Sequence, residues 1–147
     1  MKAMKVIVEK IPQGEETQVI FQVAHMTDKI RRAISILESP DKLVVYLGNE
    51  RFQVAISDIL YVETVDLKVF VYVDQAVYQS RLKLTEIEAG LDDSDFLRIS
   101  KQMIVNIGKI QSVMPAGNGR FQASLFNGEK LIISRQYVPE MKRRFGV

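Results

Sequence analysis

The stretch Phe96-Leu97-Arg98-Ile99-Ser100-Lys101-Gln102-Met103-Ile104-Val105-Asn106 predicts two short β-strands separated by a polar break. Apolar residues dominate on both sides of the break, as they do in strands that help to form a core. The break Ser100-Lys101-Gln102 carries a cation and an amide, which are typical of an exposed turn. We expect the core positions of this stretch to be Leu97, Ile99, Met103, Ile104 and Val105.

The charge of the chain changes sign around this stretch. Residues 41–97 contain five Lys and Arg against eleven Asp and Glu, a net charge of −6, whereas residues 98–147 contain nine against two, a net charge of +7. Residues 1–40 add +1, so the formal net charge of +2 conceals a strong asymmetry. A basic third beside an acidic middle suits a polyanion-binding face, although scatter of charges over a solvated surface gives the same totals.

Residues 41–147 show an all-β pattern. Short apolar and β-branched runs alternate with turn residues. Besides the two strands of the opening stretch, we expect strands at 42–47, 51–56, 58–63, 68–73, 76–80, 110–114, 121–126 and 130–134, with a turn at 115–119. The last two strands flank Asn127-Gly128, a dipeptide that strongly favours a tight hairpin. Short helices are expected at 84–91 and 138–145, from their apolar spacing.

Residues 1–40 predict a small, separate ββα unit. We expect strands at 4–11 and 18–23, followed by a helix that begins near residues 27–28 and ends near Leu37. About forty residues bury too little apolar surface to be stable alone. This extension is therefore expected to contact a second copy of the chain or another protein.

Sequence motifs for catalysis or metal binding are missing. The chain has no cysteine, and its one histidine, His25, has no neighbouring metal-ligand or nucleophile pattern. Gly117-Asn118-Gly119 resembles the start of a phosphate loop, but no helix with Lys-Ser/Thr follows it, so a tight turn explains it. We expect no enzyme activity, no cofactor and no metal site.

The sequence also predicts a cytoplasmic protein. Its first residues alternate charge with Val and Ile, unlike a signal peptide. No apolar run approaches the roughly 20 residues that span a bilayer. The absence of cysteine fits a reducing compartment.

Cationic and amide side chains gather next to the breaks between strands, where a β scaffold projects side chains toward a partner. Lys and Arg can neutralise phosphates or contact guanine, and Gln can pair with adenine. For each of these residues alone, an ordinary exposed side chain is the alternative interpretation. The candidates for DNA contact are Lys68, Arg98, Ser100, Lys101, Gln102, Arg120, Arg135 and Gln136.

Four motifs follow one another along residues 42–147. They are Asp58-Ile59-Leu60-Tyr61-Val62-Glu63, Lys83-Leu84-Thr85-Glu86-Ile87-Glu88, Phe96–Asn106 with Ile110, and Ser134-Arg135-Gln136-Tyr137-Val138. In order and spacing they resemble the LytTR domain, the DNA-binding module of LytR/AlgR-type bacterial transcription regulators. The resemblance implies an elongated, mainly β fold of several sheets with short helices. It also implies that loops, rather than a recognition helix, enter successive major grooves of repeated half-sites.

By motif, the resemblance places Lys101 and Arg135 at DNA-contacting positions and a first contact loop around Asp66-Leu67-Lys68. Many family members carry histidine where this chain has Ser100, so one donor is lost. Most members also have an N-terminal phosphoacceptor receiver of ~120 residues. Residues 1–40 cannot hold one, so the chain resembles the stand-alone LytTR regulators. Input is then expected through abundance or a partner protein, including a membrane protein.

We therefore expect a sequence-specific transcription regulator that binds double-stranded DNA as a homodimer, or as two monomers on repeated half-sites. The alternative is a protein-interaction module that regulates a partner without touching DNA, through strand edges of residues 1–40. A small-molecule-binding β enzyme is disfavoured by the lack of a convergent catalytic set.

Overall fold

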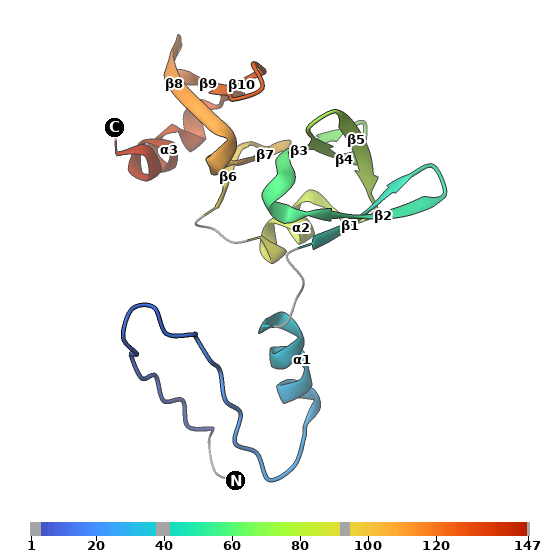
Figure 1. The fold of residues 1–147 in the computed structure, drawn as a ribbon. Helices are drawn as coiled ribbons and strands as arrows, with labels where there is room; N and C mark the ends of the chain where they lie inside the picture. The colour runs from blue at the N-terminus through green and yellow to red at the C-terminus, as the bar shows by residue number, and fades with distance from the viewer. Residues whose placement is uncertain (1–3, 38–41, 92–94, 147) are drawn as a thin grey trace. The chain divides into compact units, whose positions relative to one another are not determined.

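The computed structural model describes residues 4–37, 42–91 and 95–146 (Figure 1). The chain divides into two compact units, Met1–Glu38 and Ser39–Val147. The boundary expected between residues 40 and 41 falls within 38–41, which lie outside the described residues.

In the first unit, the helix is confirmed and the two strands are wrong. Helix α1 covers Asp28–Leu37, and Thr27 Oγ1 accepts a hydrogen bond from the Ile30 N–H (3.3 Å) at its start. Residues 4–27 form no strand. Their β-branched composition supplies strand propensity, but a strand also needs a second strand to pair with, and no described segment pairs with residues 4–27.

Ten strands form two antiparallel sheets in the described part of the second unit. One sheet has the order β2-β1-β5-β4-β3-β7-β6, and the other has the order β10-β9-β8. The strands are β1 (Lys42–Leu47), β2 (Glu50–Ala55), β3 (Ile59–Val65), β4 (Lys68–Val73), β5 (Ala76–Ser80), β6 (Phe96–Ser100), β7 (Met103–Asn106), β8 (Ile110–Gly117), β9 (Arg120–Leu125) and β10 (Lys130–Ile133). The α-helices are α2 (Leu84–Gly90) and α3 (Val138–Phe145), and single 3-10 turns are η1 (Ile56–Asp58), η2 (Ile107–Lys109) and η3 (Arg135–Tyr137).

These strands and helices lie close to the predicted positions, with one clear difference. Strand β8 continues through Pro115 to Gly117, so the turn expected at 115–119 shrinks to Asn118-Gly119. Because β8 is an edge strand, a residue without an N–H group is tolerated there.

The opening stretch lies between two core clusters. Leu97, Ile99 and Val105 pack with the inner side chains of β8–β10 and of α3. Their neighbour Ile104 belongs to the second cluster, which α2 covers. Alternate residues of β6 and β7 thus face opposite cores, which accounts for the nearly continuous apolar runs. Four of the five predicted core residues are buried, and Met103 is half-buried against the first cluster.

Asn106 links the end of β7 to the start of β3. Its side chain is buried; Nδ2 donates to the Ile59 carbonyl (2.9 Å), and Oδ1 accepts from the Gly108 N–H (3.0 Å). Both ends of the amide are therefore used, which satisfies a buried polar group and fixes how the two strands meet.

Candidate nucleic-acid interface

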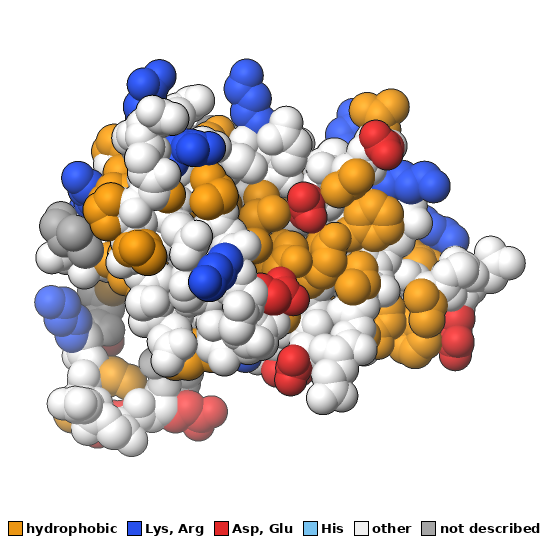
Figure 2. Space-filling model, turned by 90° about the horizontal axis from the view of Figure 1, so that it is seen from above, with side chains coloured by type: hydrophobic (Ala, Val, Ile, Leu, Met, Phe, Trp, Pro, Cys, Tyr) orange, Lys and Arg blue, Asp and Glu red, His pale blue; other side chains and the backbone are white. Residues whose placement is uncertain are grey.

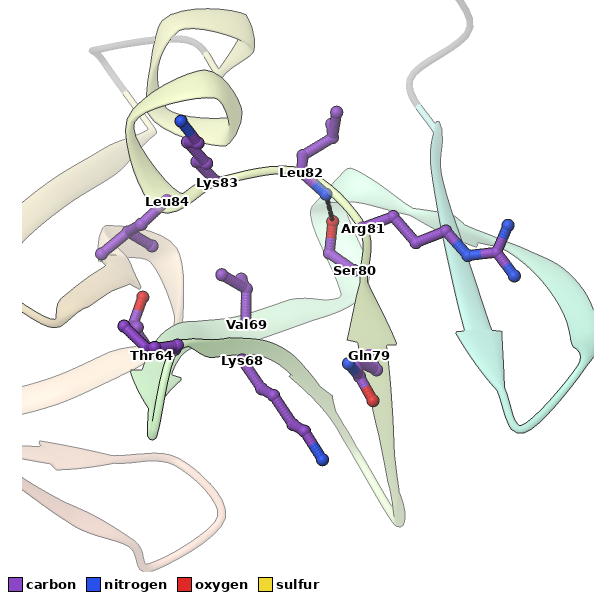
Figure 3. A pocket seen from close by; sticks show the side chains of 10 residues that line it. Thr64, Lys68, Val69, Gln79, Ser80, Arg81, Leu82, Lys83 and Leu84 are labelled. Atoms are coloured by element: carbon purple, nitrogen blue, oxygen red, sulfur yellow. Dashed lines mark hydrogen bonds between the residues drawn. The ribbon is translucent and has the colours of Figure 1, made fainter.

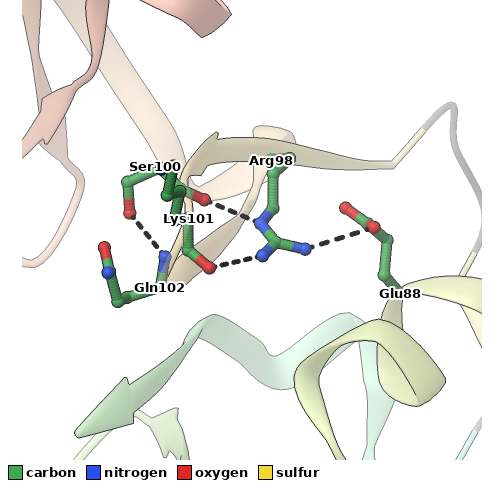
Figure 4. Close-up of polar contacts among 5 residues, drawn as sticks. All are labelled: Glu88, Arg98, Ser100, Lys101 and Gln102. Carbon is green, nitrogen blue, oxygen red and sulfur yellow. Dashed lines mark hydrogen bonds and ion pairs between the residues drawn. The ribbon is translucent and has the colours of Figure 1, made fainter.

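The side chain of Arg98 stabilises the turn between β6 and β7 through hydrogen bonds to its carbonyl groups. Its Nε donates to the Ser100 carbonyl (2.7 Å), and Nη2 donates to the Lys101 carbonyl. Its Nη1 pairs with Oε1 of Glu88 on α2 (3.2 Å). Figure 4 shows the guanidinium between the turn and Glu88. Because all three nitrogens are engaged and the side chain is only 20% exposed, Arg98 acts as a support for the turn.

The same turn presents Lys101 and Gln102 outward. Both residues are exposed. Ser100 Oγ accepts a hydrogen bond from the Gln102 N–H (3.2 Å), so this hydroxyl also helps to shape the turn. Of the four candidates between residues 98 and 102, two build the turn and two project from it.

Two backbone hydrogen bonds tie neighbouring loops to this turn. The Thr64 N–H, near the end of β3, donates to the Gln102 carbonyl (2.8 Å). The Ser134 N–H, just before η3, donates to the Ile99 carbonyl (2.8 Å). The β3–β4 hairpin and the loop that carries Arg135 and Gln136 therefore flank the β6–β7 turn.

The β8–β9 turn also lies beside these loops, because its Gly119 contacts the side chain of Arg135. In the β8–β9 turn, a Cβ atom built on Gly119 would lie 2.7 Å from Cδ of Arg135, and the φ angle of Gly119 is +76°. Only glycine therefore allows the Arg135 stem to lie against this turn. Arg120 follows directly; it is exposed, and its Nε donates to the Gly117 carbonyl (3.4 Å). Sequence reasoning interpreted Gly119 only as a turn residue, since its contact with Arg135 spans distant positions.

The β3–β4 hairpin carries an apolar residue at its tip. Asp66 and Leu67 form the two-residue turn with φ angles of 50° and 66°, and Leu67 is 98% exposed. Lys68, also exposed, pairs with Val65 at the base of the turn. A branched apolar side chain rarely adopts positive φ, so this conformation is strained. The family resemblance placed Leu67 in the first contact loop, around Asp66-Leu67-Lys68, but only Lys68 of that loop was named as a candidate for DNA contact. The strands expected at 58–63 and 68–73 left four residues between them, so the two-residue turn was not predicted.

A shallow pocket beside this hairpin does not form a convergent anion site. Its lining includes Lys68, Arg81 and Lys83, around Val69 and Leu84. In Figure 3 the three cationic side chains point in different directions, away from the centre of the pocket. The residues that the structure describes also contain no group of three His, Cys, Asp or Glu side chains placed to hold a metal ion.

The cations of the basic C-terminal third differ in how far they are neutralised. On α3, hydrogen bonds from Arg143 and then Arg144 lower the pKa of Glu140 to about 2. Lys101 and Arg135, by contrast, make no ion pair with any described residue. On the face drawn in Figure 2, Lys and Arg side chains project along the upper edge, while apolar side chains occupy much of the centre.

Tyr61, whose pKa is raised, lies where the two sheets meet. Burial, followed by a hydrogen bond with Glu129, raises the pKa of Tyr61 well above its ordinary value. Tyr61 also stacks on Tyr72, with 4.2 Å between ring centroids. Glu129 comes from the β9–β10 loop, so these contacts connect the second sheet to β3 and β4.

Comparison with known proteins agrees with this architecture. The family model for the LytTr DNA-binding domain matches residues 49–146. A solved LytTr DNA-binding domain from Bacillus cereus superposes with a TM-score of 0.69 at 24% identity, covering 73% of this chain and 98% of that one. The mainly β fold with short helices is thereby confirmed.

The chain is also similar in sequence to named bacterial proteins. The sensory transduction protein LytT of Enterococcus faecalis is 36% identical over 101 residues, and that of Bacillus subtilis is 32% identical over 102. These matches cover 68% and 69% of this chain but 42% of each relative. An uncharacterized HTH-type transcriptional regulator of Staphylococcus aureus is 26% identical over 135 residues, which cover 90% of this chain and 91% of that protein.

In the described parts of the chain, no helix is long and apolar enough to cross a membrane. The matched residues include the β3 motif, the β6–β7 stretch and the residues around Arg135, on which the predicted resemblance depends. This chain belongs to the family of LytTr DNA-binding domains.

Proposed function

We propose that this chain is a sequence-specific transcription regulator that presents four adjoining loops to double-stranded DNA. The loops are residues 66–68, 100–102, 118–120 and 134–136, together called the loop edge. The proposal is supported by two backbone hydrogen bonds, from the Thr64 N–H to the Gln102 carbonyl in the β6–β7 turn and from the Ser134 N–H to the Ile99 carbonyl in β6. An enzyme is not required by any part of this arrangement.

The loop edge suits the major groove in size and charge. That groove is about 12 Å wide and admits a two-stranded β-ribbon. Two of the loops are two-residue turns, at Asp66-Leu67 and Asn118-Gly119, and Lys101-Gln102 forms a third tight turn. Loops of this width can enter the groove, with flanking cations against the phosphates.

Seven exposed side chains of the loop edge have a proposed task. Lys101 and Arg135 contact base edges, because they project from firmly held backbone and have no ion-pair partner among the described residues. Leu67 packs on a thymine methyl group, which offers an apolar partner in the groove. The remaining contacts are Lys68 and Arg120 to phosphates, and Gln102 and Gln136 to bases or phosphates.

Two copies would act together on repeated half-sites, as a cytoplasmic homodimer or as two monomers. A protein partner, including a membrane protein, would then supply the input. These features rest on the family's architecture and on the exposed apolar residues of the first unit.

Selection of genomic fragments with the purified full chain tests the proposal. We expect a small set of enriched fragments whose protected bases recur about one helical turn, 10–10.5 bp, apart. The affinity should fall steeply with salt, because phosphate contacts release counterions. Equal recovery of all fragments at moderate salt would contradict sequence-specific binding.

The alternative, a protein-interaction module, is favoured by one observation: the apolar side chains that residues 4–23 expose. It predicts retention on a partner protein that is insensitive to salt, with no genomic fragment enriched. Fragment selection and partner retention, both measured with the purified full chain, therefore distinguish the two functions.

A further inference from the structure

The first unit leaves most of its apolar side chains uncovered. Of residues 4–34 and Leu37, only Ile30 is buried. Val6, Ile7 and Val8 are 78%, 66% and 85% exposed. Consecutive exposed β-branched residues are unusual on a finished surface and typical of a strand that awaits a partner.

The backbone of this segment is equally uncovered. Residues 4–11 belong to no strand, and they make no backbone hydrogen bond with another described segment. At Pro12 the carbonyl accepts only from the Glu15 N–H (3.3 Å), which bends the chain. An extended apolar segment with free N–H and C=O groups is a template for pairing with a strand of another chain.

The sequence of the segment is complementary to itself when reversed. Lys5-Val6-Ile7-Val8-Glu9 has Ile7 at its centre, valines on either side, and opposite charges at its ends. In a two-fold antiparallel pair centred on Ile7, each Lys5 lies opposite a Glu9 and each Val6 opposite a Val8. Opposite charges in such cross-strand pairs stabilise the pairing, and like charges weaken it.

Other registers lack this complementarity. A one-residue shift in one direction sets Lys5 opposite Lys10 and Val6 opposite Glu9, and a shift in the other direction sets Lys5 opposite Val8 and Glu9 opposite Met4. Parallel pairing in register sets Lys5 opposite Lys5 and Glu9 opposite Glu9. The centred register also gathers four valines, two from each copy, on one face of the ribbon, where they cover one another.

We propose that residues 4–11 form an antiparallel β-ribbon with the same residues of a second copy, centred on Ile7, and that this ribbon joins two DNA-binding units. The inference deepens the homodimer of the proposed function, on which it rests. Its tests are made without DNA, so failure of the ribbon and failure of DNA binding are separate results.

Charge reversal tests the register by sedimentation of the full chain. Lys5→Glu and Glu9→Lys should each weaken the dimer roughly tenfold, because two ion pairs become two repulsions. The double variant should recover the wild-type dimer, and a mixture of the two single variants should form a heterodimer. Lys10→Glu, whose side chain would lie opposite Met4, is the matched control and should dimerise like the wild type.

Cysteine crosslinking provides an independent measurement, because the chain has no cysteine of its own. Directly opposed residues of an antiparallel pair have Cα atoms about 4.5–5.5 Å apart, within reach of a disulfide. Under mild oxidation, Ile7→Cys should give a covalent dimer, and Lys5→Cys alone should not. A monomeric wild type at tens of micromolar, or a dimer unaffected by charge reversal and by Ile7→Cys oxidation, would overturn the proposal.

Discussion

At the scale of single residues, two nearby cations of the β6–β7 region have different tasks. Arg98 supports the turn from below, whereas Lys101 projects from it. Both were predicted as DNA contacts, and the sequence pattern alone could not separate them. The difference arises from Glu88 on α2 and from the orientation of two turn carbonyls, which exist only once the fold has formed.

Arg98→Lys should impair both folding and DNA binding, although it keeps the charge. Lysine cannot reproduce the planar fork that reaches two carbonyls and Glu88 at once. We expect a loss of about 1–3 kcal/mol in the free energy of unfolding, measured by urea denaturation, together with weaker binding to selected DNA. Lys101→Arg is the control, and it should leave stability unchanged. If Arg98→Lys matched the wild type in both respects, Arg98 would be acting only as a point charge.

Gly119→Ala should displace Arg135, and Gly117→Ala should not. Both glycines have positive φ angles, of +76° and +83°, so alanine strains each backbone by about 1 kcal/mol. Only at Gly119 would the new Cβ collide with the Arg135 stem. We therefore expect similar melting temperatures for the two variants and a larger loss of DNA affinity for Gly119→Ala. If the two variants bound DNA with equal affinity, the contact between Gly119 and the Arg135 stem would not contribute to DNA binding.

Leu67→Asn should stabilise the protein while weakening its binding to DNA. Asparagine tolerates positive φ better than leucine, so the turn relaxes by about 0.5–1 kcal/mol. The apolar side chain proposed to contact thymine is lost at the same time. Binding of DNA in which uracil replaces thymine supplies the check: the replacement should weaken the wild type and leave Leu67→Asn unaffected. An equal effect of uracil on both proteins would remove Leu67 from the proposed contacts.

At the scale of elements, residues 42–147 were largely predictable and residues 4–27 were not. Two-residue periodicity and turn signals located the strands of the two sheets, because each strand has neighbours that accept its pattern. In residues 4–27 the apolar and β-branched pattern predicted strands that are absent, since no neighbouring strand completes a sheet there. Pro115 led to the opposite error, because a turn was expected where strand β8 in fact continues. Proline is tolerated there because β8 lies at the edge of its sheet, and only the sheet order reveals this position.

Asn106→Asp should destabilise the junction of β7 with β3. The carboxylate can still accept from the Gly108 N–H, but it loses the donor to Ile59 and faces a carbonyl instead. We expect a loss of about 1–3 kcal/mol, or more if the buried carboxylate stays charged. Urea denaturation measures it, with Asn49→Asp in the exposed β1–β2 turn as the control. Equal stabilities of the two variants would show that the Asn106 hydrogen bonds contribute little.

At the scale of the whole molecule, four loops that are distant in sequence meet at one edge of the second unit. The family resemblance predicted that Lys101 and Arg135 act together. It could not supply the reason, which lies in the Ser134–Ile99 backbone bond and in the stem of Arg135 against Gly119. The net charge of the basic third also could not show which cations are paired: Arg143 and Arg144 pair with Glu140 on α3, whereas Lys101 and Arg135 make no ion pair with a described residue.

The central claim, that the loop edge reads DNA, is tested most directly by binding titrations of a selected genomic fragment. Lys101→Ala and Arg135→Ala should each lose about 1–3 kcal/mol of binding free energy and discriminate less between the fragment and a base-substituted copy. Lys130→Ala and Arg51→Ala, which remove exposed cations outside the loop edge, should bind like the wild type. If all four variants bound the fragment equally well, the loop edge would not be the surface that contacts DNA.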